Sequence, residues 1–163
     1  KMLVRTAIVD AELAEAMRGL LAVPGGRTVF RYRWNGDLYN LNAKRLNDYI
    51  RIYLGEEFTA KDFRTWGGTL VAASELARHG PAESERDAKR ILGRVMTVVG
   101  RELGNTPTVA RESYVSPVVV ETYLAGRTLA DFRGGRSRGP ARMSVDERAL
   151  VRLLRAASRG SRA

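Results

Sequence analysis

Signals for the start and end of helices recur along most of this chain, and they constrain its fold more than any other feature of the sequence. Apolar residues recur at helical spacing after each of several capping residues: Asp10, Asn42, Thr59 and Ser84. Two shorter helices are predicted where a hydroxyl residue precedes a proline, at Thr106-Pro107 and Ser116-Pro117. Strands and helices do not alternate along the chain, so the order of elements does not indicate a parallel sheet.

One clear β signal interrupts the helical pattern. Residues 28–34 and 37–41 are rich in aromatic and β-branched side chains, and they flank the pair Asn35-Gly36. An Asn-Gly pair between two such runs favours a tight hairpin. The sequence therefore predicts a mainly α fold with one small β-hairpin.

The rarity of cysteine and histidine excludes whole classes of chemistry. The chain has no Cys and one His, so a disulfide framework, a thiol nucleophile and a Cys/His zinc site are all ruled out. Hydrophobic residues make up 44% of the chain, enough for a core, but no apolar run approaches the ~20 residues that span a bilayer. Any catalysis must use hydroxyls, carboxylates or basic groups.

Positive charge is concentrated at the C-terminal end. The net charge is +10, and the segment from Arg133 onward holds nine arginines against two acidic residues. Residues 133–142 are Gly- and Arg-rich and predict a flexible linker, whereas Ser144 and Glu147 form a capping box for a last helix. The basic balance points to a polyanionic partner, nucleic acid before membrane. The tail either contacts phosphate backbone or only aids solubility.

Two blocks of the sequence resemble a known family. The blocks FTAKDFRTWGGT (Phe58–Thr69) and LGNTPTVARESYVSP (Leu103–Pro117) look like the catalytic helices of type IB DNA topoisomerases of the bacterial and poxvirus-like branch. The same family places a helix ending in LNDYI before the first block, as Leu46–Ile50 do here. The resemblance covers residues 1–132, which are expected to form a catalytic helical domain truncated at its N-terminal edge. Residues 133–163 are then the linker and basic C-terminal helix.

The resemblance assigns roles to individual residues. It makes Tyr114 the nucleophile, which forms a 3′-phosphotyrosyl link, and Arg64 a bidentate clamp on the attacked phosphate. Asn105 stands where many members have a histidine that bonds a phosphate oxygen, so the hydrogen bond survives without the cationic contribution. Lys1 is either the family's general-acid lysine or a residue just after it, and a further upstream arginine has no candidate. The expected DNA contacts are Lys61, Arg111, Arg136 and Arg138.

Each of these residues also has a simpler structural reading. Arg64 can be half of an ion pair with Asp62 or Glu57. Tyr114 can be a half-buried packing residue, which is the expectation for Tyr49, Tyr53 and Tyr123. Trp66 is expected to pack in the core or in the wall of the site rather than to stack on a DNA base. Gly104 with Asn105 suits a helix C-cap, and Lys61 and Arg111 suit plain surface charge.

The resemblance implies an enzyme that relaxes supercoiled DNA by cutting and resealing one strand, without ATP or metal and with no cofactor. Its partner is double-stranded DNA rather than a membrane. An N-terminal domain of the same enzyme is expected to be missing, and a monomer acting in the cytoplasm on the nucleoid is expected. The alternatives are the catalytic domain of a tyrosine recombinase or integrase, and a non-catalytic helical DNA-binding module.

Overall fold

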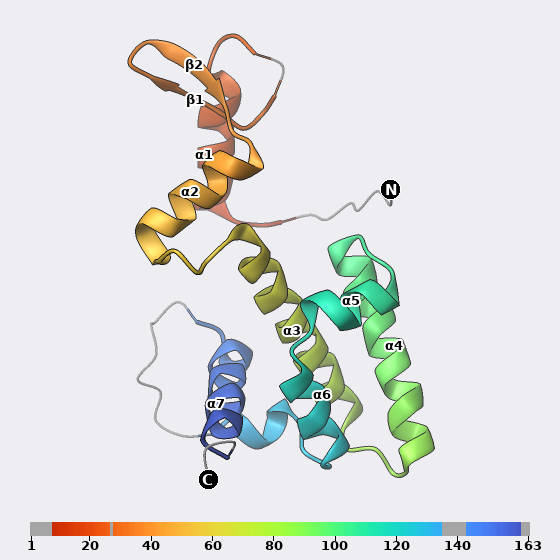
Figure 1. Ribbon diagram of the computed structural model, residues 1–163. Coiled ribbons are helices and arrows are strands. Elements are labelled where there is room, and N and C mark those ends of the chain that lie inside the picture. Colours follow the sequence, from red (N-terminus) through yellow and green to blue (C-terminus); the bar gives the residue numbers. More distant parts are fainter. Residues whose placement is uncertain (1–7, 27, 135–142, 161–163) are drawn as a thin grey trace. The chain divides into compact units, whose positions relative to one another are not determined.

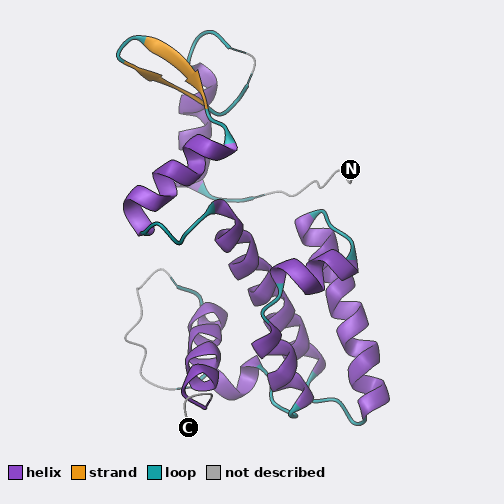
Figure 2. Ribbon diagram, in the orientation of Figure 1, coloured by secondary structure: helices purple, strands orange, loops and turns teal. Residues whose placement is uncertain are grey.

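The structure is a computed structural model that describes residues 8–26, 28–134 and 143–160. Within these ranges the chain is mostly helical with one antiparallel hairpin, which confirms the predicted fold class (Figure 2). The chain divides into two compact units, one within residues 5–62 and the other containing Phe63–Ala163. Each unit is described by itself.

The first unit contains helices α1 (Ala11–Ala22) and α2 (Ala43–Leu54) and strands β1 (Arg31–Trp34) and β2 (Asp37–Asn40) (Figure 1). The predicted caps are present, because Asp10 accepts a hydrogen bond from the backbone N–H of Leu13 and Asn42 accepts one from that of Arg45. Trp34 pairs with Asp37 across a two-residue turn. Asn35 and Gly36 both have positive φ, 49° and 87°, as a tight turn of the primed type requires.

This unit buries little of its apolar surface. Ile50 is the one residue of α2 that is buried, and α1 buries none. Tyr49 and Tyr53 lie on the same helix but are 59% and 69% exposed, so the expectation that they are packing residues was wrong. Their helical spacing places them beside Ile50, but the described elements of this unit leave them exposed.

The second unit is built from the longer helices. After α3 (Ala60–His79), which begins in the first unit, come α4 (Glu85–Leu103), α5 (Pro107–Tyr114), α6 (Pro117–Leu124), a short 3₁₀ helix η1 (Leu129–Phe132) and α7 (Val145–Gly160). The predicted cap at Ser84 accepts a hydrogen bond from Asp87 N–H, and Gly104 ends α4 in the left-handed conformation. η1 was not among the predicted elements, although its start carries a capping box made by Thr128 and Asp131.

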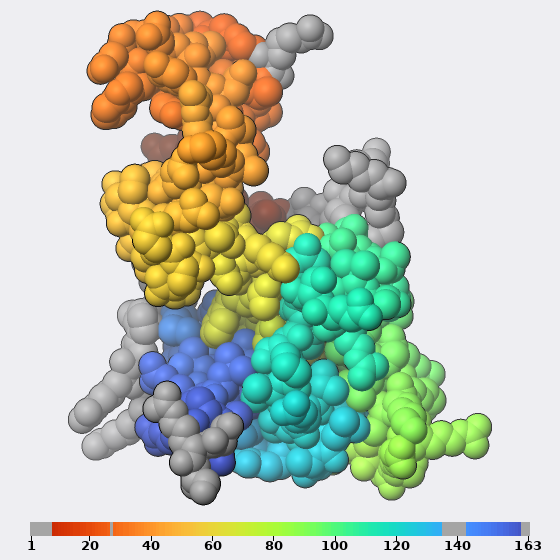
Figure 3. Space-filling model, viewed as in Figure 1, coloured from red at the N-terminus to blue at the C-terminus, as the bar shows by residue number. Residues whose placement is uncertain are grey.

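One hydrophobic core joins α3, α4, α5, α6, η1 and α7. α4 contributes its apolar face with Ile91, Val95 and Val99, and α7 contributes Leu150 and Leu153. In the space-filling view α7 and η1 form one continuous surface at the base of this unit (Figure 3). α7 is therefore an integral helix of the unit. The boundary found in the structure lies within α3, and the predicted division between residues 132 and 133 stays a prediction. Most of the predicted linker, residues 135–142, lies outside the described part of the chain.

Among the described residues, none of the helices is both long enough and apolar enough to cross a membrane.

The burial of α7 gives a stability prediction. Leu153 on α7 is 2% exposed, so Leu153→Ala removes buried side-chain volume and should lower the free energy of unfolding by about 2–5 kcal/mol. Leu124 on α6 is 56% exposed, and Leu124→Ala should change it by less than about 0.5 kcal/mol. Urea denaturation of both variants measures this difference. Equal and negligible effects would contradict a core role for α7.

Candidate active site

Three segments of the second unit bring Arg64, Asn105 and Tyr114 together. Arg64 lies in the second turn of α3, Asn105 lies in the turn between α4 and α5, and Tyr114 is the last residue of α5. Arg64 is exposed, whereas Asn105 and Tyr114 are half-buried. These are residues that the two sequence blocks singled out, and they meet although 41 and 50 positions separate Arg64 from the other two.

The turn that carries Asn105 is fixed by its backbone. Gly104 has φ 68° and ψ 35°, and its N–H bonds the carbonyls of Arg101 and Gly100. The N–H of Asn105 bonds the carbonyl of Gly100 at 2.7 Å. The simpler reading of Gly104 and Asn105 as a helix C-cap is therefore correct for their backbones. The Asn105 side chain also bonds this end of α4, through the carbonyl of Leu103.

Two donors meet at the carbonyl oxygen of Leu103. The guanidinium Nη2 of Arg64 lies 2.8 Å from this oxygen, and the amide Nδ2 of Asn105 lies 3.1 Å from it. The carbonyl belongs to the last turn of α4, where backbone acceptors lack a partner within the helix and carry partial negative charge. A cationic donor and a neutral donor therefore converge on one electron-rich oxygen.

The same guanidinium lies over the ring of Tyr114. The distance from Arg64 Cζ to the ring centroid is 4.9 Å, within the range of a cation–π contact. Arg64 thus contacts both the ring of Tyr114 and the Leu103 carbonyl oxygen, to which Asn105 also donates. A chemical group that took the place of the Leu103 oxygen would meet both donors next to the phenol.

A close contact between α3 and α5 sets this arrangement. A Cβ atom added to Gly68 would lie 2.6 Å from the carbonyl oxygen of Tyr114 and 3.2 Å from its Cβ. The neighbouring Thr69 hydroxyl accepts a hydrogen bond from the N–H of Ser116 at 3.0 Å, and its oxygen is 3.4 Å from the Tyr114 carbonyl. Only a glycine at position 68 allows the end of α5 to approach α3 so closely.

Three parts of this arrangement were not predicted from the sequence: Gly68, Thr69 and the Leu103 carbonyl. A signal for the first was present, because two successive glycines inside a predicted helix lower its stability and usually have a packing reason. No sequence signal marks a particular main-chain carbonyl as the meeting point of two side chains.

The alternative ion pair of Arg64 with Asp62 is not formed. The carboxylate of Asp62 accepts hydrogen bonds from the backbone N–H and the hydroxyl of Thr59, at 2.8 and 2.9 Å. These bonds hold the pKa of Asp62 below its ordinary value. Asp62 therefore bonds Thr59, the residue predicted to cap α3, while Arg64 turns to Leu103 and Tyr114.

Two other predicted site residues that the structure describes, Arg111 and Lys61, are not part of this group. Arg111 is exposed on α5 and lines a hollow of about 900 Å³ together with Lys89 and Glu112. Lys61 is exposed in the first turn of α3, on the part of the helix that belongs to the first unit. Lys1, Arg136 and Arg138 lie outside the described residues.

Comparison with known proteins identifies relatives for most of the chain. Residues 9–125 match the family described as eukaryotic DNA topoisomerase I, catalytic core. The chain is also similar to a protein named DNA topoisomerase 1B from Acanthamoeba polyphaga mimivirus, with 32% identity over 93 residues. This second match covers 55% of the chain and 27% of the viral protein, so the similarity concerns about a quarter of that relative.

The close approach at Gly68 gives a prediction with a control on the adjacent residue. Gly68→Ala places a methyl group against the Tyr114 backbone and should destabilise the chain by about 1–3 kcal/mol through overpacking. A Cβ at Gly67 meets nothing within 4 Å, so Gly67→Ala should stabilise the helix by about 0.5–1 kcal/mol. Urea titration of the two variants checks the opposite signs. A stable Gly68→Ala chain would show that the contact does not constrain the site.

Proposed function

The chain belongs to the type IB DNA topoisomerase family, as part of its catalytic region, and from this premise we propose that it relaxes supercoiled double-stranded DNA through a covalent tyrosine intermediate. In this proposal Tyr114 attacks one strand and forms a 3′-phosphotyrosyl bond. The free 5′ end rotates, and its hydroxyl then attacks the bond and reseals the strand. Neither ATP nor a metal ion takes part, because the phosphotyrosyl bond conserves the energy needed for resealing.

The observation that carries this proposal is the convergence of Arg64 and Asn105 on one oxygen beside the Tyr114 ring. A phosphate oxygen bears more negative charge than a carbonyl oxygen and is the stronger acceptor for an arginine. DNA can therefore take over both donors from Leu103 when its phosphate enters. No step requires the backbone of α4 to move, since the donors are side chains.

The donors assist the chemical step in the following way. A phenol is a weak nucleophile, and the phosphate that it attacks is itself anionic, so negative charge grows on the non-bridging oxygens during attack. Donors already aimed at those oxygens stabilise the transition state, typically by several kcal/mol. Arg64 supplies a planar cationic fork and Asn105 supplies one neutral donor.

The leaving 5′ oxygen needs a proton. The family uses an upstream lysine for this step, and the candidate in this chain is Lys1, which lies outside the described residues. Four basic residues are proposed to contact the DNA backbone: Arg111, Lys61, Arg136 and Arg138. Contacts to the phosphates are electrostatic and do not depend on the base sequence. An enzyme that acts on DNA works where the chromosome lies. The chain is therefore proposed to act as a monomer in the cytoplasm, associated with the nucleoid.

The tyrosine is tested by removing its hydroxyl. Tyr114→Phe should abolish the covalent protein–DNA adduct and leave noncovalent affinity within about twofold, because the attacking oxygen alone is lost. The assay incubates the chain with an end-labelled duplex, with the upstream half of the enzyme added in trans, and quenches it with detergent. Tyr123→Phe is the control, since this tyrosine is buried and should not affect cleavage.

An adduct formed by the Tyr114→Phe chain would refute the assignment of the nucleophile. The complete absence of an adduct from the unaltered chain, with the upstream half present, would favour a non-catalytic DNA-binding module. Strand exchange between defined sites would instead favour a tyrosine recombinase.

The arginine is tested by comparing two positions. Arg64→Ala should slow cleavage at saturating DNA by about 10²–10³-fold while weakening binding far less, because its contacts strengthen in the transition state. Arg111→Ala should do the reverse, weakening binding and lowering the salt dependence by about one phosphate contact without slowing cleavage. Cleavage rates and salt-dependent affinities distinguish the two. Equal losses of rate and affinity for Arg64→Ala would show that Arg64 makes only an ordinary phosphate contact.

A further inference from the structure

The solvent side of α4 carries a row of basic residues. α4 buries Ile91, Val95 and Val99 in the core, so its opposite side is exposed. Successive residues of a helix are about 100° apart, which places the arginines of this side within about 80° of one another around the helix axis. We call these arginines, together with the exposed Lys89, the basic face of α4: Arg86, Lys89, Arg90, Arg94 and Arg101.

Carboxylates at the start of α4 neutralise part of this face. Glu85 forms an ion pair with Lys89 at 2.6 Å, and Asp87 forms one with Arg90. The hydrogen bond from Arg90 holds the pKa of Asp87 below its ordinary value. Both carboxylates lie in the first turn, where negative charge complements the helix dipole. They therefore stabilise the start of the helix and pair with the cations nearest to it.

The other cations of the basic face are free of close carboxylates. Glu102 lies 4.0 Å from Arg101, whose side chain is 73% exposed, and such a pair contributes little in water. Within the described part of the chain, Arg86 and Arg94 form no ion pair, and Arg94 acts on Asp87 only through space. Arg86 lies in the first turn, where a cation opposes the dipole, so helix stability does not explain it. These cations can bind an anion from outside the chain.

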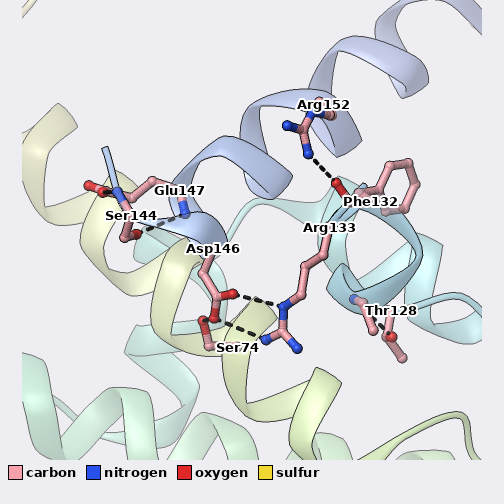
Figure 4. A network of polar contacts seen from close by, with 9 residues as sticks. Ser74, Thr128, Phe132, Arg133, Ser144, Asp146, Glu147 and Arg152 are labelled. Atoms are coloured by element: carbon pink, nitrogen blue, oxygen red, sulfur yellow. Dashed lines mark hydrogen bonds and ion pairs between the residues drawn. The ribbon is translucent and has the colours of Figure 1, made fainter. Parts of the chain in front are cut away.

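Two arginines of the C-terminal segment, in contrast, bond to the fold. Arg133 donates to Asp146 from Nε at 2.9 Å and from Nη2 at 3.1 Å, and Arg152 donates to the carbonyl of Phe132 at 2.6 Å (Figure 4). Asp146 also accepts a bond from the hydroxyl of Ser74 at 2.8 Å. These arginines hold α7 in place, so they are less accessible to DNA than the basic face of α4.

The basic face borders the candidate active site. Arg101 lines a hollow of about 540 Å³ together with Asn105. Nearer the start of the helix, Lys89 and Gly93 line the hollow of about 900 Å³ that also holds Arg111, a predicted DNA contact. One side of α4 therefore adjoins both the proposed cleavage site and a residue that the sequence assigned to DNA.

The length of the basic face suits the backbone of a DNA strand. Arg101 lies 15 positions after Arg86, which corresponds to about 22 Å along the helix. A strand of duplex DNA has one phosphate about every 3.4 Å along its axis, so a backbone that follows this face would pass about six phosphates. Arginine and lysine bind phosphates through their charge and N–H donors without reading the bases.

We propose that the basic face of α4 binds the phosphate backbone of the duplex that is cleaved, where this backbone continues beyond the phosphate attacked by Tyr114. This surface rests on the proposed function, since it contacts the same substrate. It adds a binding surface to the single contacts predicted from the sequence. The basic face holds DNA without touching the reacting atoms, so its loss should weaken binding and leave the cleavage of bound DNA at its normal rate.

Removing two cations tests the surface. Arg86→Gln/Arg94→Gln leaves no carboxylate without its ion pair, and glutamine retains a high helix propensity. The slope of log affinity against log salt concentration should fall in magnitude by about two, because two phosphate contacts are lost. Arg18→Gln, at an exposed position of α1, removes a charge elsewhere and should leave the slope unchanged. Noncovalent affinity is measured for each in the Tyr114→Phe background.

Adding a cation gives the opposite test with a matched control. Gly93 on α4 and Gly19 on α1 are both exposed, and a Cβ at either meets nothing within 4 Å. Gly93→Lys should tighten binding and steepen the slope by about one, whereas Gly19→Lys adds the same charge and should change neither. Both substitutions replace a helix glycine with a better helix former, so neither should unfold the chain.

Cleavage separates this surface from the proposed function. Single-turnover rates at saturating DNA, with Tyr114 restored and the upstream half added in trans, should stay within about twofold for Arg86→Gln/Arg94→Gln. An unchanged slope for this variant, while the unaltered chain still forms its adduct, overturns the surface and leaves the proposed function standing. If the slope changes as expected but the unaltered chain forms no adduct, the proposed function is overturned and the surface stands as a DNA contact.

Two further outcomes would overturn the surface. Changes of equal size in Arg18→Gln and Gly19→Lys would show that net charge alone, and not the basic face, sets the affinity. Unchanged affinity of Arg86→Gln/Arg94→Gln for one duplex, with loss only of the ability to bridge two duplexes, would show that the face binds a second DNA molecule rather than the cleaved one.

Discussion

The contact between α3 and the end of α5 at Gly68 is the constraint on which the candidate site depends. With no side chain at this position, the backbone of Tyr114 can lie against α3, and Arg64, one turn earlier on the same face, then reaches over the tyrosine ring. The Thr69 hydroxyl holds the following residue in place through the N–H of Ser116. A larger residue at position 68 would push Tyr114 away from Arg64, so the two side chains proposed for cleavage depend on a residue that has no chemistry of its own.

The last turn of α4 serves both folding and the proposed chemistry. Its terminal carbonyls need donors from outside the helix, and the Leu103 carbonyl obtains them from Arg64 and Asn105. The hydrogen bonds to this carbonyl orient both side chains before any DNA is bound. Stabilising a helix end and preparing a site for an anion are compatible, because a carbonyl oxygen and a phosphate oxygen accept hydrogen bonds from the same donors.

The sequence predicted local structure well because capping and turn formation depend on residues close in the chain. Asp10, Asn42, Ser84 and the Asn35-Gly36 turn behave as their residue types require. Burial was harder to predict, since it depends on distant elements: Tyr49 and Tyr53 have the spacing of core residues but are exposed. Arg64, Asn105 and Tyr114 were selected by resemblance, and the structure brings them together. The contacts of the Leu103 carbonyl and the bond between Ser74 and Asp146 depend only on tertiary packing.

The most direct test of this account is to map the residue that becomes bonded to DNA. The chain, with the upstream half of the enzyme in trans, is incubated with a duplex from which the cleaved strand cannot be resealed. It is then digested and analysed by mass spectrometry. Six tyrosines are present, and the account predicts a nucleotide adduct on Tyr114 alone. An adduct on another residue, or none while the DNA remains bound, would contradict it.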